Sequence, residues 1–214
     1  MTFAARYLMN MLAAPIYHQY KNLTLHNRTV RIRPQNWQTR SIFVHIPKTA
    51  GFSVAIDLYG RDPWHFSLVE YGAIADLGAF HSFTIVREPA NRLNSMFHYL
   101  KTLRIVHPSA TRLQSAGSFV EFVHLFADHC GPARYPFLRS QVDFTRLGDD
   151  PIGVDSVLRF ERLEADYRDL RERLGLPASL LPRLNASASK VPLSRSDRSV
   201  VEKLLPQEYE IFGY

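Results

Sequence analysis

A lysine, a threonine and a glycine follow a short apolar run, and these residue types in this order can bind an anion. The run at residues 42–46 is rich in β-branched residues, as expected of a buried parallel strand, and a proline ends it. Lys48, Thr49 and Gly51 then supply a flexible cation, a hydroxyl group and room for close backbone approach, just before a helical segment predicted at 51–58. A strand, a tight loop and a helix N-terminus direct backbone N–H groups at one point, so the sequence predicts an anion site there.

A second group of candidate anion ligands follows the next predicted strand, at residues 82–87. Arg87 is the last residue of this strand, and its planar guanidinium group can bind a phosphate through two hydrogen bonds. Ser95 lies two turns into the following predicted helix. Because the carboxyl ends of parallel strands meet at one edge of a sheet, Lys48 and Arg87 are expected to lie together. The alternative for each residue alone is structural: Arg87 would pair with a carboxylate, and Ser95 would only be tolerated in its helix.

The order of predicted elements indicates the α/β class. Strands at 41–46, 82–87 and 154–160 alternate with helical patterns, which predicts a three-layer α/β/α fold with a central parallel sheet. Residues 41–214 are expected to form a single domain, and residues 1–40 an N-terminal helix followed by an irregular or edge-strand extension. The predicted helices are 51–58, 68–75, 90–103, 117–130, 163–174 and, as the last helix, 197–205, with a further helix before the turn at 148–151.

Composition limits the classes of partner. The 214 residues are 46% apolar and carry a formal net charge of +6, which suits an anionic ligand, although a solvated basic surface is the commoner cause. Zinc-ligand spacing, a basic heptad region and an RNA-binding aromatic motif are absent from the sequence, so nucleic acid is not a predicted partner. The single cysteine, Cys130, cannot form an intrachain disulfide and is expected in the core.

No apolar run of the sequence is long enough for a transmembrane helix. Residues 1–20 are apolar but interrupted by polar residues and offer no clear cleavage site, so we do not predict a signal peptide. An amphipathic helix that packs on the domain is the preferred interpretation, and peripheral contact of residues 1–20 with a membrane is the alternative. The short chain and the lone cysteine are more typical of a bacterial cytoplasmic enzyme than of one in an oxidising lumen.

The residues of the first loop resemble those of a known family. Residues 45–53, His-Ile-Pro-Lys-Thr-Ala-Gly-Phe-Ser, resemble the 5′-phosphosulfate-binding loop of the carbohydrate sulfotransferases, in the branch that contains heparan sulfate 2-O-sulfotransferase and many bacterial relatives. That loop commonly reads H-I-P-K-T-A-G-T-S, and Phe52 departs from it. Residues 86–95 resemble the 3′-phosphate motif of the family, V-R-[DN]-P-x-x-R-L-x-S, with Glu88 as a small departure. Arg92 of this motif is better assigned to an internal ion pair.

The resemblance extends from residue 41 to 214. Residues 158–163 resemble an R-F-E-x-L segment, residues 184–187 an L-N-A-S loop and residues 209–214 a terminal Y-E-x-F-G-Y. It implies a P-loop-like fold, 3′-phosphoadenosine-5′-phosphosulfate (PAPS) as the donor, a carbohydrate or glycoconjugate hydroxyl as the acceptor, and no metal. The implied donor-binding residues are Lys48, Thr49, Ala50, Gly51, Phe52, Ser53, Arg87, Ser95 and Lys190, with Arg195 and Arg198 as alternatives to Lys190.

Sulfuryl transfer needs a base for the acceptor proton and a cation for the leaving phosphate oxygen. Lys48 suits the second task, and a histidine suits the first. His65 is the predicted base because the resembled 2-O-sulfotransferases carry their catalytic histidine at this distance before the arginine of the second motif. His45 is expected to be structural, and His81 and His98 are weaker alternatives.

Two other functions stay open at this stage. One is an ATP-dependent kinase or phosphotransferase, which shares the strand, loop and helix anion site, although the G-x-x-x-x-G-K-[ST] spacing and a clear magnesium-binding carboxylate are missing. The other is a catalytically inactive nucleotide-binding protein, which Phe52 and the small size of the chain would allow.

Overall fold

The computed structural model describes residues 29–103, 108–131, 134–181 and 192–214. Three of the sequence-based predictions fall outside these ranges: the N-terminal helix, the loop at 184–187 and Lys190. Within the described ranges, no helix combines the length and the apolar character needed to cross a membrane.

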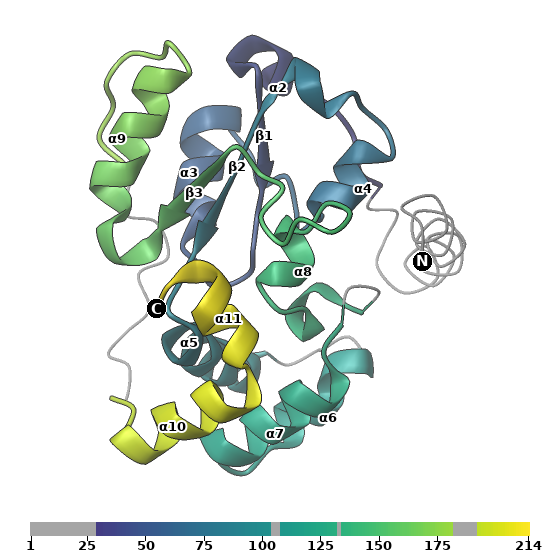
Figure 1. Cartoon of the computed structure of the whole chain (residues 1–214), viewed down its shortest axis with the longest axis vertical. Coiled ribbons are helices and arrows are strands. Elements are labelled where there is room, and N and C mark those ends of the chain that lie inside the picture. The colour runs from purple at the N-terminus through teal and green to yellow at the C-terminus, as the bar shows by residue number, and fades with distance from the viewer. Residues whose placement is uncertain (1–28, 104–107, 132–133, 182–191) are drawn as a thin grey trace.

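A small parallel sheet forms the centre of the molecule (Figure 1). Strands β1 (Ser41–Val44), β2 (His81–Val86) and β3 (Ser156–Arg159) pair in the order β1-β2-β3, with both neighbouring pairs parallel. In the register, Val44 lies opposite Thr84, and Thr84 opposite Val157. The predicted α/β class and the central parallel sheet are therefore confirmed, and the carboxyl ends of β1 and β2 lie next to each other.

Helices cover both faces of this sheet because successive strand residues point to opposite sides. On one face, α3 (Gly51–Tyr59) and α9 (Leu163–Arg173) pack over strand residues of all three strands. On the other face, α4 (Leu68–Gly72) and α8 (Val142–Thr145) pack over residues of β1 and β2. The buried apolar strand residues of the first face are Phe43, Phe83, Ile85 and Leu158, and those of the second are Ile42, Val44 and Val86.

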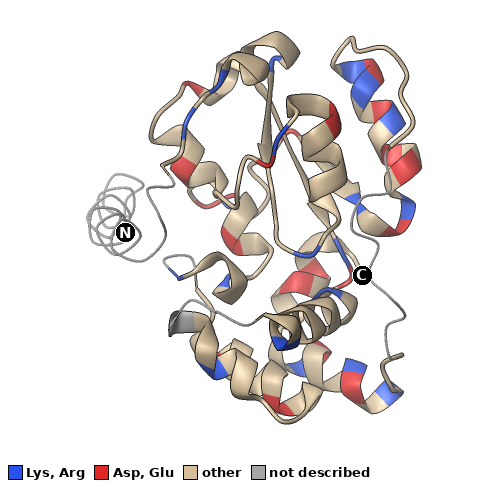
Figure 2. Cartoon of the chain, turned by 180° about the vertical axis from the view of Figure 1, so that it is seen from behind, with Lys and Arg blue, Asp and Glu red and all other residues tan. Residues whose placement is uncertain are grey.

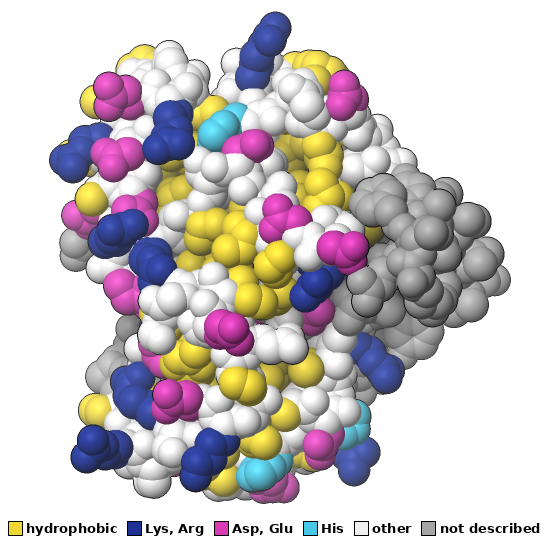
Figure 3. All heavy atoms as spheres, viewed as in Figure 1, with side chains coloured by type: hydrophobic (Ala, Val, Ile, Leu, Met, Phe, Trp, Pro, Cys, Tyr) yellow, Lys and Arg dark blue, Asp and Glu magenta, His cyan; other side chains and the backbone are white. Residues whose placement is uncertain are grey.

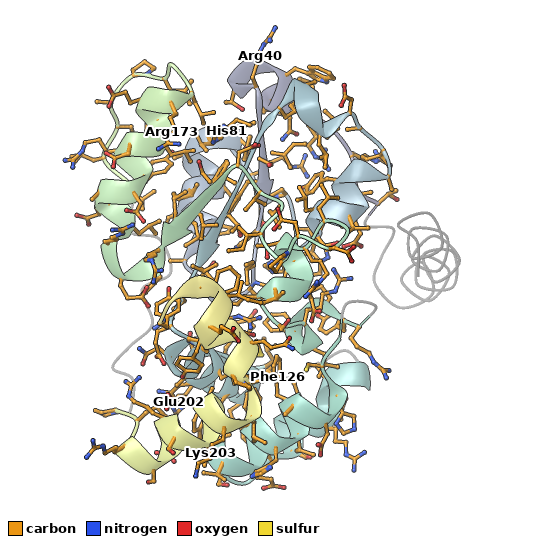
Figure 4. The ribbon with its side chains drawn as sticks, viewed as in Figure 1. Arg40, His81, Phe126, Arg173, Glu202 and Lys203 are labelled. Carbon is orange, nitrogen blue, oxygen red and sulfur yellow. The ribbon has the colours of Figure 1, made fainter. Side chains whose placement is uncertain are left out.

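A helical half lies beyond the carboxyl ends of the strands (Figure 1). It consists of α5 (Pro89–Thr102), α6 (Pro108–Ser115), α7 (Phe119–His129) and α10 (Arg195–Leu204), which share one apolar cluster. Figure 4 labels Phe126 of α7, which is fully buried in this cluster, and Glu202 and Lys203 of α10, which are exposed. The last helix, α11 (Pro206–Phe212), joins the two halves because Tyr209 packs on the helical cluster and Phe212 on the sheet.

Several element predictions need correction. The chain at 34–39 forms a helix, α2 (Pro34–Thr39), where an irregular or edge-strand segment was expected. The helix predicted as the last one begins at Arg195, where Ser194 and Asp197 form a capping box, and it is followed by α11. Helix α6 was also missed. The predicted helix at 68–75 ends at Gly72, and the third strand is shorter than the predicted 154–160. Short 3₁₀ helices occur at Leu77–Ala79, Pro136–Leu138 and Phe160–Arg162.

The surface carries charges of both signs. Along α9, basic and acidic side chains alternate (Figure 2), as on an ordinary solvated helix. On the face shown in Figure 3, hydrophobic side chains reach the surface mainly in the middle. The edge strand β3 is only partly buried. Neither α9 nor the middle of the face in Figure 3 therefore forms a basic patch.

A fully buried arginine connects the sheet to the helical half. Arg92 of α5 donates hydrogen bonds from Nε to the carbonyl oxygen of Pro47, at 3.2 Å, and from Nη2 to that of Arg139, at 2.9 Å. Its Nη1 lies 3.6 Å from Oε1 of Glu208 on α11, which is also buried. The predicted internal ion pair of Arg92 is therefore confirmed.

Replacing Glu208 with alanine should lower the free energy of unfolding by about 3–5 kcal/mol, because it leaves the buried charge of Arg92 without compensation. Urea denaturation followed by circular dichroism measures the loss. Glu210→Ala, an exposed change on the same helix, is the matched control and should cost less than about 0.5 kcal/mol. Equal stability of the two variants would contradict the role of this ion pair.

Candidate functional site

The loop after β1 has the backbone conformation of an anion-binding site. Lys48 and Ala50 adopt left-handed conformations, with φ of 71° and 64°, and α3 begins immediately afterwards at Gly51. The hydroxyl group of Thr49, which is fully buried, donates to the carbonyl oxygen of Ile46 at 2.9 Å and closes the loop. Alternation of left- and right-handed residues turns successive N–H groups toward one side, and the N-terminus of α3 has no side-chain cap. Residues 48–52 therefore form one cradle of backbone donors, since the N–H of Ser53 already donates to the carbonyl oxygen of Ala50.

Gly51 allows this cradle to lie directly on the rings of β1 and the residue after it. A Cβ atom at Gly51 would be 2.4 Å from Cδ2 of His45 and 2.6 Å from Cζ of Phe43, which are distances that real Cβ atoms do not show. The two rings are stacked, with centroids 5.1 Å apart. The first turn of α3 is thus held against β1 by the absence of a side chain.

Arg87 brings the second predicted motif to the same place. Its Nη1 donates to the carbonyl oxygen of Lys48 at 3.2 Å, and its guanidinium carbon lies 4.0 Å from the ring centroid of Phe160. The side chain is buried, and Nε has no hydrogen-bond partner among the described residues. Burial lowers the pKa of Arg87, while the nearby carboxylates of Glu161 and Glu88 act in the opposite direction. The structure therefore holds a buried cation beside the loop, with one donor that no described residue uses.

The backbone of Arg87 is fixed by a buried glutamine. Gln141 accepts from the Arg87 N–H at 2.9 Å and donates to the Arg87 carbonyl oxygen at 2.8 Å. The Glu208 carboxylate in turn accepts from the backbone and side-chain nitrogens of Gln141, at 3.0 and 2.8 Å. The position of Arg87 thus depends on contacts with residues far away in the sequence.

Lys48 and His65, the two predicted catalytic residues, contact one aromatic cluster. The Nζ atom of Lys48 lies 3.9 Å from the ring centroid of Tyr99 on α5, and Tyr99 stacks on Phe137 at 5.7 Å. The His65 ring meets the same Phe137 edge-on, at 6.0 Å between centroids. The two side chains therefore contact neighbouring rings of this cluster, Lys48 at Tyr99 and His65 at Phe137.

The hydrogen bond of His65 determines which of its nitrogens is basic. Nδ1 lies 2.9 Å from the carbonyl oxygen of His45, and since a carbonyl oxygen only accepts, Nδ1 carries the proton of the neutral ring. Nε2 then carries the lone pair, as a general base requires. The side chain is only 8% exposed.

An acidic residue that the sequence analysis did not single out lies beside the two histidines. Oδ1 of Asp62 accepts from Nδ1 of His45 at 2.9 Å and from the backbone N–H of Trp64 at 3.0 Å. His45, Asp62 and His65 are also the one group of three potential metal ligands in the described ranges, with ligand atoms within 4.8 Å of one another. Nδ1 of His45 is bonded to Asp62 and Nδ1 of His65 to the carbonyl oxygen of His45, so the three residues form a hydrogen-bonded cluster. That the protein needs no metal stays a prediction.

The pKa of Asp62 is held well below its ordinary value of 3.8. Burial alone would raise this pKa, but the hydrogen bond from His45, the charges of His45 and His65 and the Trp64 N–H outweigh it. A carboxylate with a lowered pKa in the folded state stabilises the protein above its ordinary pKa and loses this effect as the pH falls.

The remaining predicted residues are only partly accounted for. Ser95 is buried on α5, but the described residues show no hydrogen bond between it and Arg87. Arg198 donates to Glu88 at 3.0 Å and to Asn91 at 3.2 Å, which ties α10 to the start of α5, whereas Arg195 is exposed. His81, one of the alternative bases, lies at the amino end of β2 and contacts Ser156, so it is remote from this loop.

The motif at 158–163 and the terminal motif at 209–214 contact each other, and the first of them also contacts the start of α5. Arg159 donates from Nη2 to the carbonyl oxygen of Phe212, and the Tyr214 hydroxyl donates to Glu161 at 3.0 Å. Glu161 also accepts from the backbone N–H of Glu88 at 2.9 Å. The end of the chain therefore supports the segment that follows Arg87.

Asp62, Gln141 and Tyr99 belong to the site but were not predicted. Asp62 lies in a turn and accepts from the N–H two residues on, which is a recognisable Asx-turn signal. The contacts of Gln141 and Tyr99 join segments dozens of residues apart, and no local pattern of the sequence predicts them.

Replacing Gly51 with alanine should lower the free energy of unfolding by about 1–3 kcal/mol, because the new methyl group meets the rings of His45 and Phe43. Chemical denaturation checks this. Gly117→Ala is the control, since a Cβ atom there has an ordinary contact of 3.4 Å with Glu121. A Gly51→Ala protein as stable as the control variant would show that the rings can move away.

The wild type should have a larger free energy of unfolding than Asp62→Asn. This difference should be constant from about pH 5 down to the ordinary pKa of 3.8, and it should shrink below that pH. The sign follows from the lowered pKa, since protonation removes the stabilisation by the folded carboxylate. Denaturation at a series of pH values measures it. Asp169→Asn, at a carboxylate that is 67% exposed, should show almost no difference at any of these pH values. A wild-type advantage that persists unchanged at acid pH would contradict the account.

Comparison of the chain with models of known families, with curated proteins and with solved structures finds no match.

Proposed function

We propose that the protein is a PAPS-dependent sulfotransferase that moves a sulfuryl group to a hydroxyl of a carbohydrate or glycoconjugate. The observation that carries this proposal is the 3.2 Å hydrogen bond from Arg87 to the carbonyl oxygen of Lys48. It joins the two motifs that resemble the 5′-phosphosulfate and 3′-phosphate sites of the family. Within the proposal, the sheet with helices on both faces is assigned to the P-loop-like three-layer α/β/α fold.

The residues present fit the donor at two points. The left-handed Lys48 and Ala50 and the uncapped start of α3 offer backbone N–H groups to the 5′-phosphosulfate. The buried Nε of Arg87, which has no hydrogen-bond partner among the described residues, is a suitable donor to the 3′-phosphate. Phe52 is half-buried and supplies no hydroxyl group, so the loop has to bind mainly through its backbone.

The proposed reaction is an in-line displacement. Nε2 of His65 takes the proton of the acceptor hydroxyl, and the acceptor oxygen forms a bond to sulfur while the bond from sulfur to the 5′-phosphate oxygen breaks. Lys48 stabilises the negative charge that develops on this leaving oxygen. The hydrogen bond of His65 supports this role. Because Nδ1 donates to the carbonyl oxygen of His45, the lone pair of the neutral ring is on Nε2.

Isothermal titration calorimetry with 3′-phosphoadenosine-5′-phosphate tests the proposal. We expect tight binding that does not need magnesium, is selective over ATP, and is weakened about 10- to 100-fold in Arg87→Ala, which loses charge-assisted hydrogen bonds to the 3′-phosphate. Lys48→Ala should also weaken binding, whereas His65→Ala should leave the affinity unchanged.

Arg173→Ala is the matched control because this arginine is exposed at the end of α9, which lies toward the amino end of the sheet (Figure 4). Its affinity should equal that of the wild type. No binding by the wild type, or a preference for ATP with magnesium, would contradict the proposal, and the second result would favour the kinase.

A further inference from the structure

The backbone just before His65 is in an unfavourable conformation. Trp64 has φ of 72°, and a bulky residue in this region is a genuine outlier that persists only when its surroundings hold it. The N–H of Trp64 donates to Oδ1 of Asp62 at 3.0 Å, and the indole ring lies 5.1 Å from the His65 ring, centroid to centroid. Asp62 is thus one group that holds the turn that presents His65.

The same oxygen atom also binds the side chain of His45, the residue whose carbonyl oxygen accepts from His65. Oδ1 of Asp62 binds Nδ1 of His45 at 2.9 Å, and the other side of the His45 ring is limited by Phe43 and Gly51. With its side chain held in this way, the carbonyl oxygen of His45 faces Nδ1 of His65 at 2.9 Å, and the two rings are 4.4 Å apart.

We propose that Asp62 is a positioning residue for the base, because its Oδ1 atom ties the turn before His65 to His45 and so keeps His65 in the tautomer with the proton on Nδ1. This inference rests on the proposed function for the role of His65, but the tautomer itself is a property of the protein alone. The position of the Oδ1 atom determines the tautomer in this proposal, and the charge of the carboxylate is not required.

Nitrogen-15 NMR of the imidazole rings, recorded on the full chain near pH 8 without ligand, distinguishes the two tautomers. The signals of His65 are assigned by their disappearance in His65→Gln. In the wild type we expect the Nδ1–H tautomer to predominate. In Asp62→Ala the ratio of Nδ1–H to Nε2–H should fall about five-fold, the shift that corresponds to the loss of one ordinary hydrogen bond.

Two further variants separate geometry from charge and keep the test decisive if Asp62→Ala does not fold. Asp62→Asn retains an oxygen at the same position and should keep the wild-type ratio. Asp62→Glu retains the charge but moves the oxygen by one methylene group, so its ratio should fall as in Asp62→Ala. Asp155→Ala is the matched control, since this carboxylate accepts two hydrogen bonds from Ser82, both of 2.7 Å, at the other end of the sheet.

A wild-type His65 with the proton mainly on Nε2 would overturn the proposal. So would an unchanged ratio in both Asp62→Ala and Asp62→Glu, or a normal ratio in Asp62→Glu with a lowered one in Asp62→Asn. Calorimetry with 3′-phosphoadenosine-5′-phosphate on the same samples keeps the two claims apart: its failure in the wild type would count against the sulfotransferase and not against the role of Asp62.

Discussion

The arrangement of the site depends on one buried side chain, Arg92. It donates to the carbonyl oxygens of Pro47 and Arg139 and forms an ion pair with Glu208, so it joins the loop after β1, the segment before α8 and the helix α11. A buried arginine is stable only when its charge is compensated, and the partners of Arg92 come from three distant parts of the chain. The loop can therefore hold its two left-handed residues, Lys48 and Ala50, because the helical half is fixed against it.

The Glu208 carboxylate also links Arg92 to Arg87, the second predicted anion ligand, through Gln141. It accepts from Gln141, and Gln141 in turn holds both backbone polar groups of Arg87. The carboxyl ends of β1 and β2 are neighbours in the sheet, so the fold brings Lys48 and Arg87 together, and the buried network sets their separation. The sheet thus brings Lys48 and Arg87 close together, and the buried residues beyond the sheet determine how the two are oriented.

The sequence allowed most of the fold to be predicted, but only part of the site. Strands and helices with a clear apolar period, such as β2 and α5, were placed within one or two residues, whereas α2 and α11 are too short for periodicity, and only the prolines at their first turns mark them. The ion pair of Arg92 was predicted. The contacts of Asp62 with His45 and of Gln141 with Arg87 were missed because the tertiary structure fixes them, although the Asx turn at Asp62 is a local signal.

The measurement that tests the central claim most directly is a crystal structure of the protein with 3′-phosphoadenosine-5′-phosphate. The account predicts the 5′-phosphate on the backbone N–H groups of residues 49–52, near Nζ of Lys48, and the 3′-phosphate within hydrogen-bond distance of the Arg87 guanidinium. It also predicts His65 beside the 5′-phosphate, with Nδ1 still on the carbonyl oxygen of His45. A nucleotide bound elsewhere, or one that leaves Arg87 and the loop without contacts, would contradict it.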